Sequence, residues 1–137
     1  MQPVVNAFHH QPTGSWTYVV MDPGTRAAAV IDPVLDYDWR SGRTGTPSAD
    51  QVIEHCRAAE ASVLWILETH AHADHLSAAQ HLRTTLGGGV AIGRGVRTNE
   101  DGIRQVADLL GPHGISVLGY DLPLWQGEEA CLHLMSV

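Results

Sequence analysis

The chain contains no lysine, and its basic side chains are arginines scattered along the sequence without forming a basic stripe. Its formal net charge is −7. A nucleic-acid-binding surface needs clustered positive charge to neutralise phosphates. We therefore expect no nucleic-acid partner.

Cysteine is also scarce, since Cys56 and Cys131 are the only two in the chain. Two cysteines are too few for a disulfide framework, and Cys56 falls on the apolar side of a predicted helix, where we expect a small buried hydrophobe. The sequence has neither a secretory-signal pattern nor an apolar run of membrane-spanning length. These absences predict no membrane association and a cytoplasmic location.

What the chain does have is the composition of one globular domain, with 137 residues of which 44% are hydrophobic. Alternating or continuous apolar runs predict strands, and apolar residues at helical spacing predict helices. Strands are expected at residues 4–8, 16–20, 27–31, 63–67, 90–92 and 115–118. Helices are expected from Ser48, from Leu76 to Leu86 and from Ile103 to Leu110, with residues 36–47 as a polar loop. Ser48 and Gln51 form a capping-box pattern. Strands first, then strands alternating with helices, predict an α/β (layered α+β) sandwich half with a mixed sheet and helices on its outer face.

The most informative segment holds three histidines and an aspartate, His70, His72, Asp74 and His75, directly after the apolar run 63–67. Neutral imidazoles bind zinc, iron and copper, and a carboxylate compensates the charge of a divalent cation. In an extended loop His70 and His72 point the same way and can share one metal, while Asp74 and His75 turn toward a second. A His-rich surface loop is the alternative, but it does not explain this spacing between a strand and a helix.

Other candidates carry weaker signals. A carboxylate at Asp32, which ends an apolar strand, can accept backbone N–H bonds and brace the metal loop from outside the ligand set. His9 and His10 are expected to be a solvated pair, and His55 and His81 to be surface or satisfied core residues. The tryptophans are expected to pack in the core or against loops; these are Trp16, Trp39, Trp65 and Trp125.

The pattern His70-x-His72-x-Asp74-His75 resembles the signature of the metallo-β-lactamase fold superfamily. Further matches lie in Asp32-Pro33-Val34, in the loop Ser41-Gly42-Arg43-Thr44 and in the residues that flank the histidines. Together they resemble the persulfide dioxygenase branch and its β-lactamase-hydrolase-like relatives. Glyoxalase II, a hydrolase cousin, generally shares the metal motif without the Ser-Gly-Arg loop. The resemblance covers residues 4–93.

This resemblance implies an enzyme that oxidises a small thiol-derived substrate such as glutathione persulfide in sulfide detoxification, with one Fe(II). His70 would be an iron ligand, and His72, Asp74 and His75 would then hold water or orient the ligands. The alternative is a glyoxalase II-like thioester hydrolase with two Zn(II) or mixed divalent metals. There His70 and His72 would hold one metal, Asp74 and His75 the other, and Asp74 would also orient the attacking hydroxide. The substrate-binding residues are not predicted.

Residues 94–137 diverge from the family, whose later motifs supply further histidine and aspartate ligands. No later histidine or aspartate of this chain stands in a matching context; the histidines are His113 and His133, and the aspartates are Asp101, Asp108 and Asp121. We therefore expect an apparently truncated domain over residues 1–137, with an incomplete metal site. Half a sandwich would leave an apolar sheet face uncovered, which predicts a homo-oligomer formed through that face. A non-catalytic remnant remains a further alternative.

Overall fold

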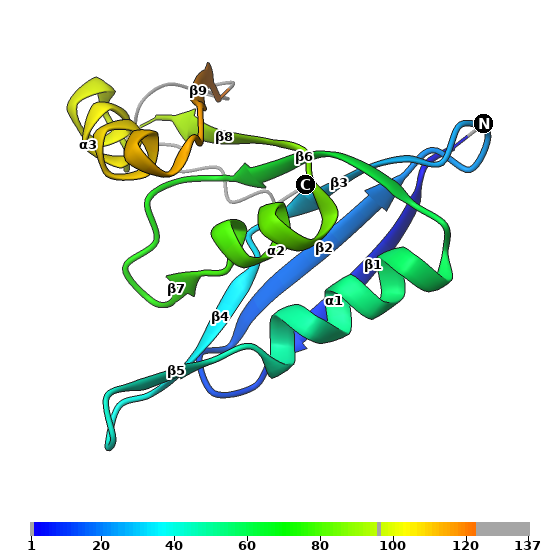
Figure 1. Ribbon diagram of the computed structural model, residues 1–137, viewed down its shortest axis with the longest axis horizontal. Helices are drawn as coiled ribbons and strands as arrows, with labels where there is room; N and C mark the ends of the chain where they lie inside the picture. Colours follow the sequence, from blue (N-terminus) through cyan, green and yellow to red (C-terminus); the bar gives the residue numbers. More distant parts are fainter. Residues whose placement is uncertain (1, 96, 123–137) are drawn as a thin grey trace, which may run out of the picture.

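A computed structural model describes residues 2–95 and 97–122 (Figure 1). A large mixed sheet has the strand order β1-β2-β3-β6-β8-β9, and a small one has the order β5-β4-β7. The large sheet consists of β1 (Val4–His10), β2 (Ser15–Met21), β3 (Ala27–Ile31), β6 (Ser62–Glu68), β8 (Gly89–Arg94) and β9 (Val117–Asp121). The small sheet consists of β4 (Val34–Asp38), β5 (Arg43–Gly45) and β7 (Leu76–Ser77). The helices are α1 (Pro47–Ala58), α2 (Ala79–Leu86), α3 (Glu100–Leu110) and the short 3₁₀ helix η1 (Gly111–His113).

The large sheet is mixed because its two halves connect differently. β1, β2 and β3 form an antiparallel meander, whereas β3, β6, β8 and β9 are parallel neighbours. Parallel neighbours need crossovers, which α1, α2 and α3 supply. This confirms the predicted layered fold with a mixed sheet.

The hydrophobic core lies between one face of the large sheet and helices α1 and α2, which cross in front of it (Figure 1). Val52 and Cys56 from α1 and Leu82 from α2 are buried against Val30 and Ile66 of the sheet. The burial of Cys56 confirms its prediction. Burial of an apolar side chain stabilises the fold by about 1.5–3 kcal/mol, so this interface holds the sheet and the helices together.

The strand predicted at residues 63–67 is central, between β3 and β8, but it is buried on one face only. Ala28 pairs with Val63 and Ala29 with Trp65, so Leu64 is skipped by the pairing as a bulge. A bulge breaks the alternation of side chains, which is why Leu64 and Trp65 are exposed one after the other.

The prediction of a loop over residues 36–47 holds for the turn at 39–42 but is wrong for 36–38 and 43–45, which lie in β4 and β5. Asp36, Tyr37 and Asp38 pair with β5, and together the two strands form a hairpin that projects from the molecule (Figure 1). Asp38 closes the turn, because its carboxylate accepts hydrogen bonds from the Arg40 N–H at 2.9 Å and the Ser41 hydroxyl at 2.8 Å. Hydrogen bonds between an aspartate and residues two or three positions later are local, and hydrophobic periodicity does not detect them.

Two predicted helix starts also differ from the structure. The first helix begins at Pro47, a residue pre-organised for the first helical position, and Ser48 donates its hydroxyl to Asp36 instead of forming the predicted capping box. Leu76 does not begin the second helix. It lies in β7, where it pairs with Leu35 of β4. Ser77 then accepts a hydrogen bond from the Ala79 N–H at 3.0 Å, where α2 begins.

Three tryptophans are more exposed than expected for core residues. Trp16, Trp39 and Trp65 expose 37%, 75% and 41% of their surface, and Trp125 lies outside the described residues. Trp16 and Trp65 lie on the sheet face opposite α1 and α2, as the register of β2, β3 and β6 requires. Among residues 2–95 and 97–122, no helix has the length and apolarity needed to cross a lipid bilayer.

Candidate metal centre

The histidine loop follows β6 at the carboxyl end of the parallel strands. β3 ends beside it, where the Asp32 N–H donates to the Leu67 carbonyl at 2.9 Å. Asp32 has a φ of 49°, in the left-handed region that aspartate tolerates better than most residues. This backbone conformation turns the chain at the end of β3, next to the start of the histidine loop.

Asp32 braces that loop through its carboxylate. Its Oδ1 accepts a hydrogen bond from the Thr69 N–H at 2.7 Å, and its Oδ2 accepts one from the Thr69 hydroxyl at 2.8 Å. Oδ1 also lies 2.9 Å from Nε2 of His72. Asp32 therefore contacts two residues of the loop; its role beside a bound metal stays a prediction.

His70 is oriented by the same residues. The Thr69 hydroxyl donates to Asp32, so its oxygen accepts from Nδ1–H of His70, 2.8 Å away. That tautomer leaves Nε2 as an acceptor, and it lies 3.3 Å from Nη1 of Arg97. Burial, followed by the positive charges of His72 and Arg97, lowers the pKa of His70 to about 4. His70 is therefore neutral at pH 7, the form that binds metals.

His72 is held through its Nε2, whereas His70 is held through its Nδ1. Nε2 faces Oδ1 of Asp32 and also lies 3.3 Å from Oε2 of Glu68, without the alignment of a hydrogen bond. Burial lowers the pKa of His72, but the two carboxylates outweigh it and raise that pKa to about 10. Burial raises the pKa of Glu68. Since Nε2 carries its hydrogen toward Asp32, Nδ1 is the nitrogen that a metal would take, in exchange for a proton.

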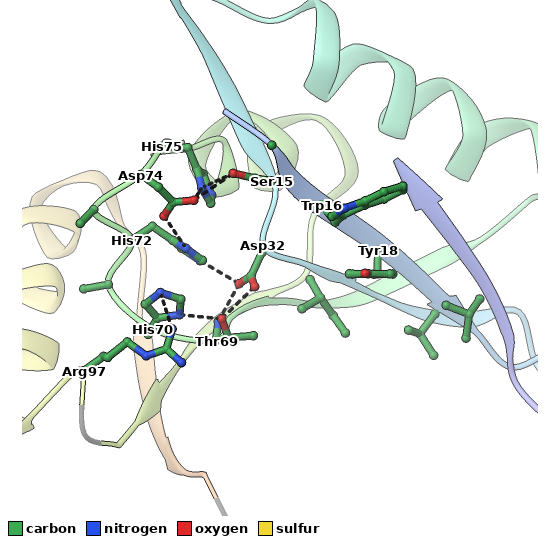
Figure 2. A pocket seen from close by; sticks show the side chains of 16 residues that line it. Ser15, Trp16, Tyr18, Asp32, Thr69, His70, His72, Asp74, His75 and Arg97 are labelled. Atoms are coloured by element: carbon green, nitrogen blue, oxygen red, sulfur yellow. Dashed lines mark hydrogen bonds and ion pairs between the residues drawn. The ribbon is translucent and has the colours of Figure 1, made fainter. Parts of the chain in front are cut away.

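Asp74 and His75 meet Ser15 at the start of β2 (Figure 2). The Ser15 hydroxyl donates to Oδ2 of Asp74 at 2.9 Å, and Nδ1 of His75 lies 3.2 Å from both oxygens. Burial opposes ionisation of Asp74, but the hydrogen bonds from His75 and Ser15 leave its pKa well below the usual range. Burial, with the charge of His72, lowers the pKa of His75.

The second nitrogen of His75 is the clearest sign of a missing partner. Its side chain is only 2% exposed, and Nε2 is buried without a hydrogen-bond partner among residues 2–95 and 97–122. With Nδ1–H directed at Asp74 and Ser15, Nε2 carries a lone pair. An unsatisfied buried acceptor is costly unless something binds it. A divalent cation would satisfy it.

These contacts bring the predicted residues together. One ligand atom each from His70, His72 and Asp74 lies within 4.8 Å of the others, and so do atoms of a second group, Asp32, Glu68 and His72. The rings of His70 and His72, and those of His72 and His75, have centroids 4.1 Å apart. The donor types suit a divalent transition metal. Asp74 lies with His70 and His72, whereas the spacing of the motif predicted that it would share a metal with His75; which residues share one metal stays a prediction.

The loop forms one end of a groove of about 1080 Å³ that extends over the open sheet face. Its apolar wall includes Trp16, Val20 and Ile31, and Arg97 lies beside His70 (Figure 2). Sequence reasoning singled out neither Ser15 nor Arg97 for this site. Neither is close in sequence to the histidines, so no spacing pattern could have identified them.

No family model matches the sequence. The chain is 52% identical over 97 residues to a probable metallo-hydrolase of Burkholderia pseudomallei, which covers 71% of this chain and 33% of that protein. It is 45% identical over 107 residues to a β-lactamase hydrolase-like protein of Xylella fastidiosa, covering 78% of this chain and 25% of that protein. The crystal structure of ETHE1 from Myxococcus xanthus matches with a TM-score of 0.54 and 25% identity, over 64% of this chain and 34% of that one.

Over the part it spans, the chain belongs to the metallo-β-lactamase fold superfamily. It spans about a quarter to a third of the length of these relatives. The superfamily resemblance predicted from the histidine motif is therefore confirmed for this segment.

Proposed function

We propose that this chain contributes the first ligands of a divalent metal centre in a persulfide dioxygenase that uses one Fe(II) and acts on glutathione persulfide. The observation that carries the proposal is the convergence of His70, His72 and Asp74 within 4.8 Å. The resemblance of the Ser41–Thr44 loop to that branch favours dioxygenation over hydrolysis.

In this proposal the side chains have separate tasks. Nε2 of His70 is the acceptor nitrogen left by its bond to Thr69, whereas His72 is protonated in the metal-free chain and would bind through Nδ1 only after losing that proton. Asp32 keeps the His72 ring in one tautomer, as outer hydrogen-bond partners of metal ligands commonly do. Ferrous iron would supply redox chemistry toward oxygen and positions for the substrate. Arg97, beside His70 at the groove, offers positive charge to an anionic persulfide.

A second candidate is a glyoxalase II-like thioester hydrolase with two zinc ions. The specific observation in its favour is His75, whose Nε2 is buried without a hydrogen-bond partner in the described part of the chain, although a single-iron site does not need it as a ligand. His70 and His72 would hold one metal, and Asp74 and His75 the other. Asp74 would also orient the attacking hydroxide.

A chimera tests these functions. Residues 1–93 replace the matching segment of the Burkholderia relative, to which the chain is 52% identical. We expect oxygen uptake with glutathione persulfide when the chimera is loaded with Fe(II), and its loss in His70→Ala but not in His9→Ala. Hydrolysis of a glutathione thioester with Zn(II), without oxygen uptake, would support the second candidate. Neither activity in a folded chimera would support the non-catalytic reading.

A further inference from the structure

A row of polar side chains connects β4 with the histidine loop. Its first member is Asp36, whose Oδ1 lies 3.4 Å from Nε2 of His10. Nδ1 of His10 lies 2.7 Å from the Thr13 hydroxyl, which lies 2.9 Å from the Ser15 hydroxyl. Ser15 then contacts Asp74 and His75, 59 and 60 positions later in the chain. The row therefore joins the β1–β2 turn to the metal loop.

From His10 through Thr13 and Ser15 to Asp74, the donors in this row all point the same way. The Asp74 carboxylate only accepts, so the single hydrogen of the Ser15 hydroxyl is donated to it. The oxygen of Ser15 accepts from the Thr13 hydroxyl, and the oxygen of Thr13 accepts from Nδ1–H of His10. His10 is itself 8% exposed, contrary to the predicted solvated pair, and so its ring is fixed in place. Ser48 holds Asp36 with its N–H and its hydroxyl, both at 2.8 Å.

Ser15 binds one of the two oxygens of the Asp74 carboxylate and so restrains its orientation. The side chain of Asp74 is 55% exposed and would otherwise sample several rotamers. Ser15 and His75 hold Oδ2, and Oδ1 is left on the side of His72, 3.6 Å from its Nδ1. The same contact keeps Nδ1–H of His75 directed at Ser15 and Asp74, which leaves Nε2 as its acceptor nitrogen.

We infer that Ser15 is a positioning residue of the metal centre, which fixes the Asp74 carboxylate and the His75 ring in the orientation that binds the metal, with Thr13 and His10 supporting it. This inference rests on the proposed metal site. It assigns a role to the β1–β2 turn, a part of the chain that contains none of the predicted ligands. Partners outside the ligand set commonly change metal affinity by about 10–100-fold.

The experiment uses the 137-residue chain and Co(II), whose visible absorption reports the geometry and charge of its ligands. Affinity and band shape are measured for the unchanged chain and for Ser15→Ala, Ser15→Thr, Thr13→Val and Ser41→Ala. Ser41→Ala is the matched control, because the Ser41 hydroxyl also donates to an aspartate, Asp38, at 2.8 Å, but in the β4–β5 turn. Thermal melts confirm that each variant is folded.

We expect Ser15→Ala to weaken Co(II) binding by about tenfold and to change the band shape, the lower end of the range for outer partners of metal ligands. Ser15→Thr keeps the hydroxyl and should restore both, Thr13→Val should cause a smaller loss, and Ser41→Ala should cause none. Unchanged binding and bands in a folded Ser15→Ala would overturn the positioning role while leaving the metal site intact. No Co(II) binding by the unchanged chain would overturn the metal site, and this inference with it.

Discussion

Nε2 of His72 lies 2.9 Å from Oδ1 of Asp32, a residue 40 positions earlier at the end of the neighbouring strand. One carboxylate thus determines both the tautomer of a candidate ligand and the path of the loop that carries it, because it also accepts two hydrogen bonds from Thr69. Asp32 and His72 are far apart in the sequence but in direct contact in the folded chain. This contact depends on the parallel pairing of β3 with β6.

We expect Asp32→Ala to lower the free energy of unfolding by about 1–3 kcal/mol or more, because it leaves partly buried donors of Thr69 and His72 without an acceptor. Asp32→Asn should cost less, since it keeps one acceptor and tolerates the left-handed backbone. Urea unfolding followed by tryptophan fluorescence measures both. Asp22→Ala is the control, because Asp22 makes the same kinds of bonds, to Gly24 and Thr25, on the surface. An equal loss in both alanine variants would contradict the bracing role.

Gly93 should not accept a side chain. A Cβ at this position would lie 2.4 Å from the carbonyl oxygen of Thr69, which is closer than atoms pack. Gly93→Ala must therefore push β8 away from the start of the histidine loop, and we expect a loss of about 1–3 kcal/mol in unfolding free energy. Gly111→Ala is the matched control, because no described residue lies within 4 Å of the added Cβ there. Equal melting temperatures for the two variants would contradict this packing.

Metal binding by the chain should depend on His70 and His72 and should be weak. Catalytic sites typically have about three protein ligands and structural sites about four, and of the three donors that converge here the Asp74 side chain is 55% exposed, while the family's later ligand motifs have no counterpart in this sequence. Elemental analysis after gentle dialysis should find less than one equivalent of iron or zinc. Titration with Co(II) should show binding that His70→Ala and His72→Ala remove and His113→Ala preserves. Tight, stoichiometric metal after dialysis would show that other residues complete the site.

The metal-free protein should lose stability at alkaline pH through His72. Its folded pKa of about 10 lies above the ordinary value of 6.5, so its contribution to stability is complete below about pH 6.5 and disappears as the pH rises through 10. With a chelator present, the difference in urea midpoint between the unchanged chain and His72→Gln should therefore shrink between about pH 6 and pH 10. A difference that stays constant or grows would show that Asp32 and Glu68 do not stabilise a protonated His72.

The chain should self-associate through the sheet face opposite α1 and α2. On that face the exposed apolar residues of the described chain include Val5, Trp16, Trp65 and Leu118, at 56%, 37%, 41% and 52% exposure. Apolar surface gains about 25 cal/mol per Å² on burial, which favours association. Light scattering should show dimers or larger species that Val5→Glu reduces. Leu109→Glu is the control, because Leu109 is 72% exposed but lies on α3. A monodisperse monomer would contradict the prediction.

Much of the fold could be predicted because its signals are local. The strands at residues 27–31 and 63–67 and the helix ending at Leu110 follow from runs and spacings of apolar residues. The β4–β5 hairpin and the start of α2 could not be predicted this way. There the conformation follows hydrogen bonds that Asp38 and Ser77 accept, from the Ser41 hydroxyl and the Ala79 N–H, and these bonds compete with the apolar pattern.

By itself the sequence determined the composition of the histidine loop and its place after a central strand, because donor types and apolar runs are properties of neighbouring residues. The tertiary structure decided which nitrogen of each imidazole is left to bind a metal. That choice depends on Asp32 and Ser15, which reach the loop only after β3 pairs with β6 and β1 pairs with β2. An acceptor must come within hydrogen-bond distance to fix a tautomer, and such distances are set by packing between elements far apart in the chain.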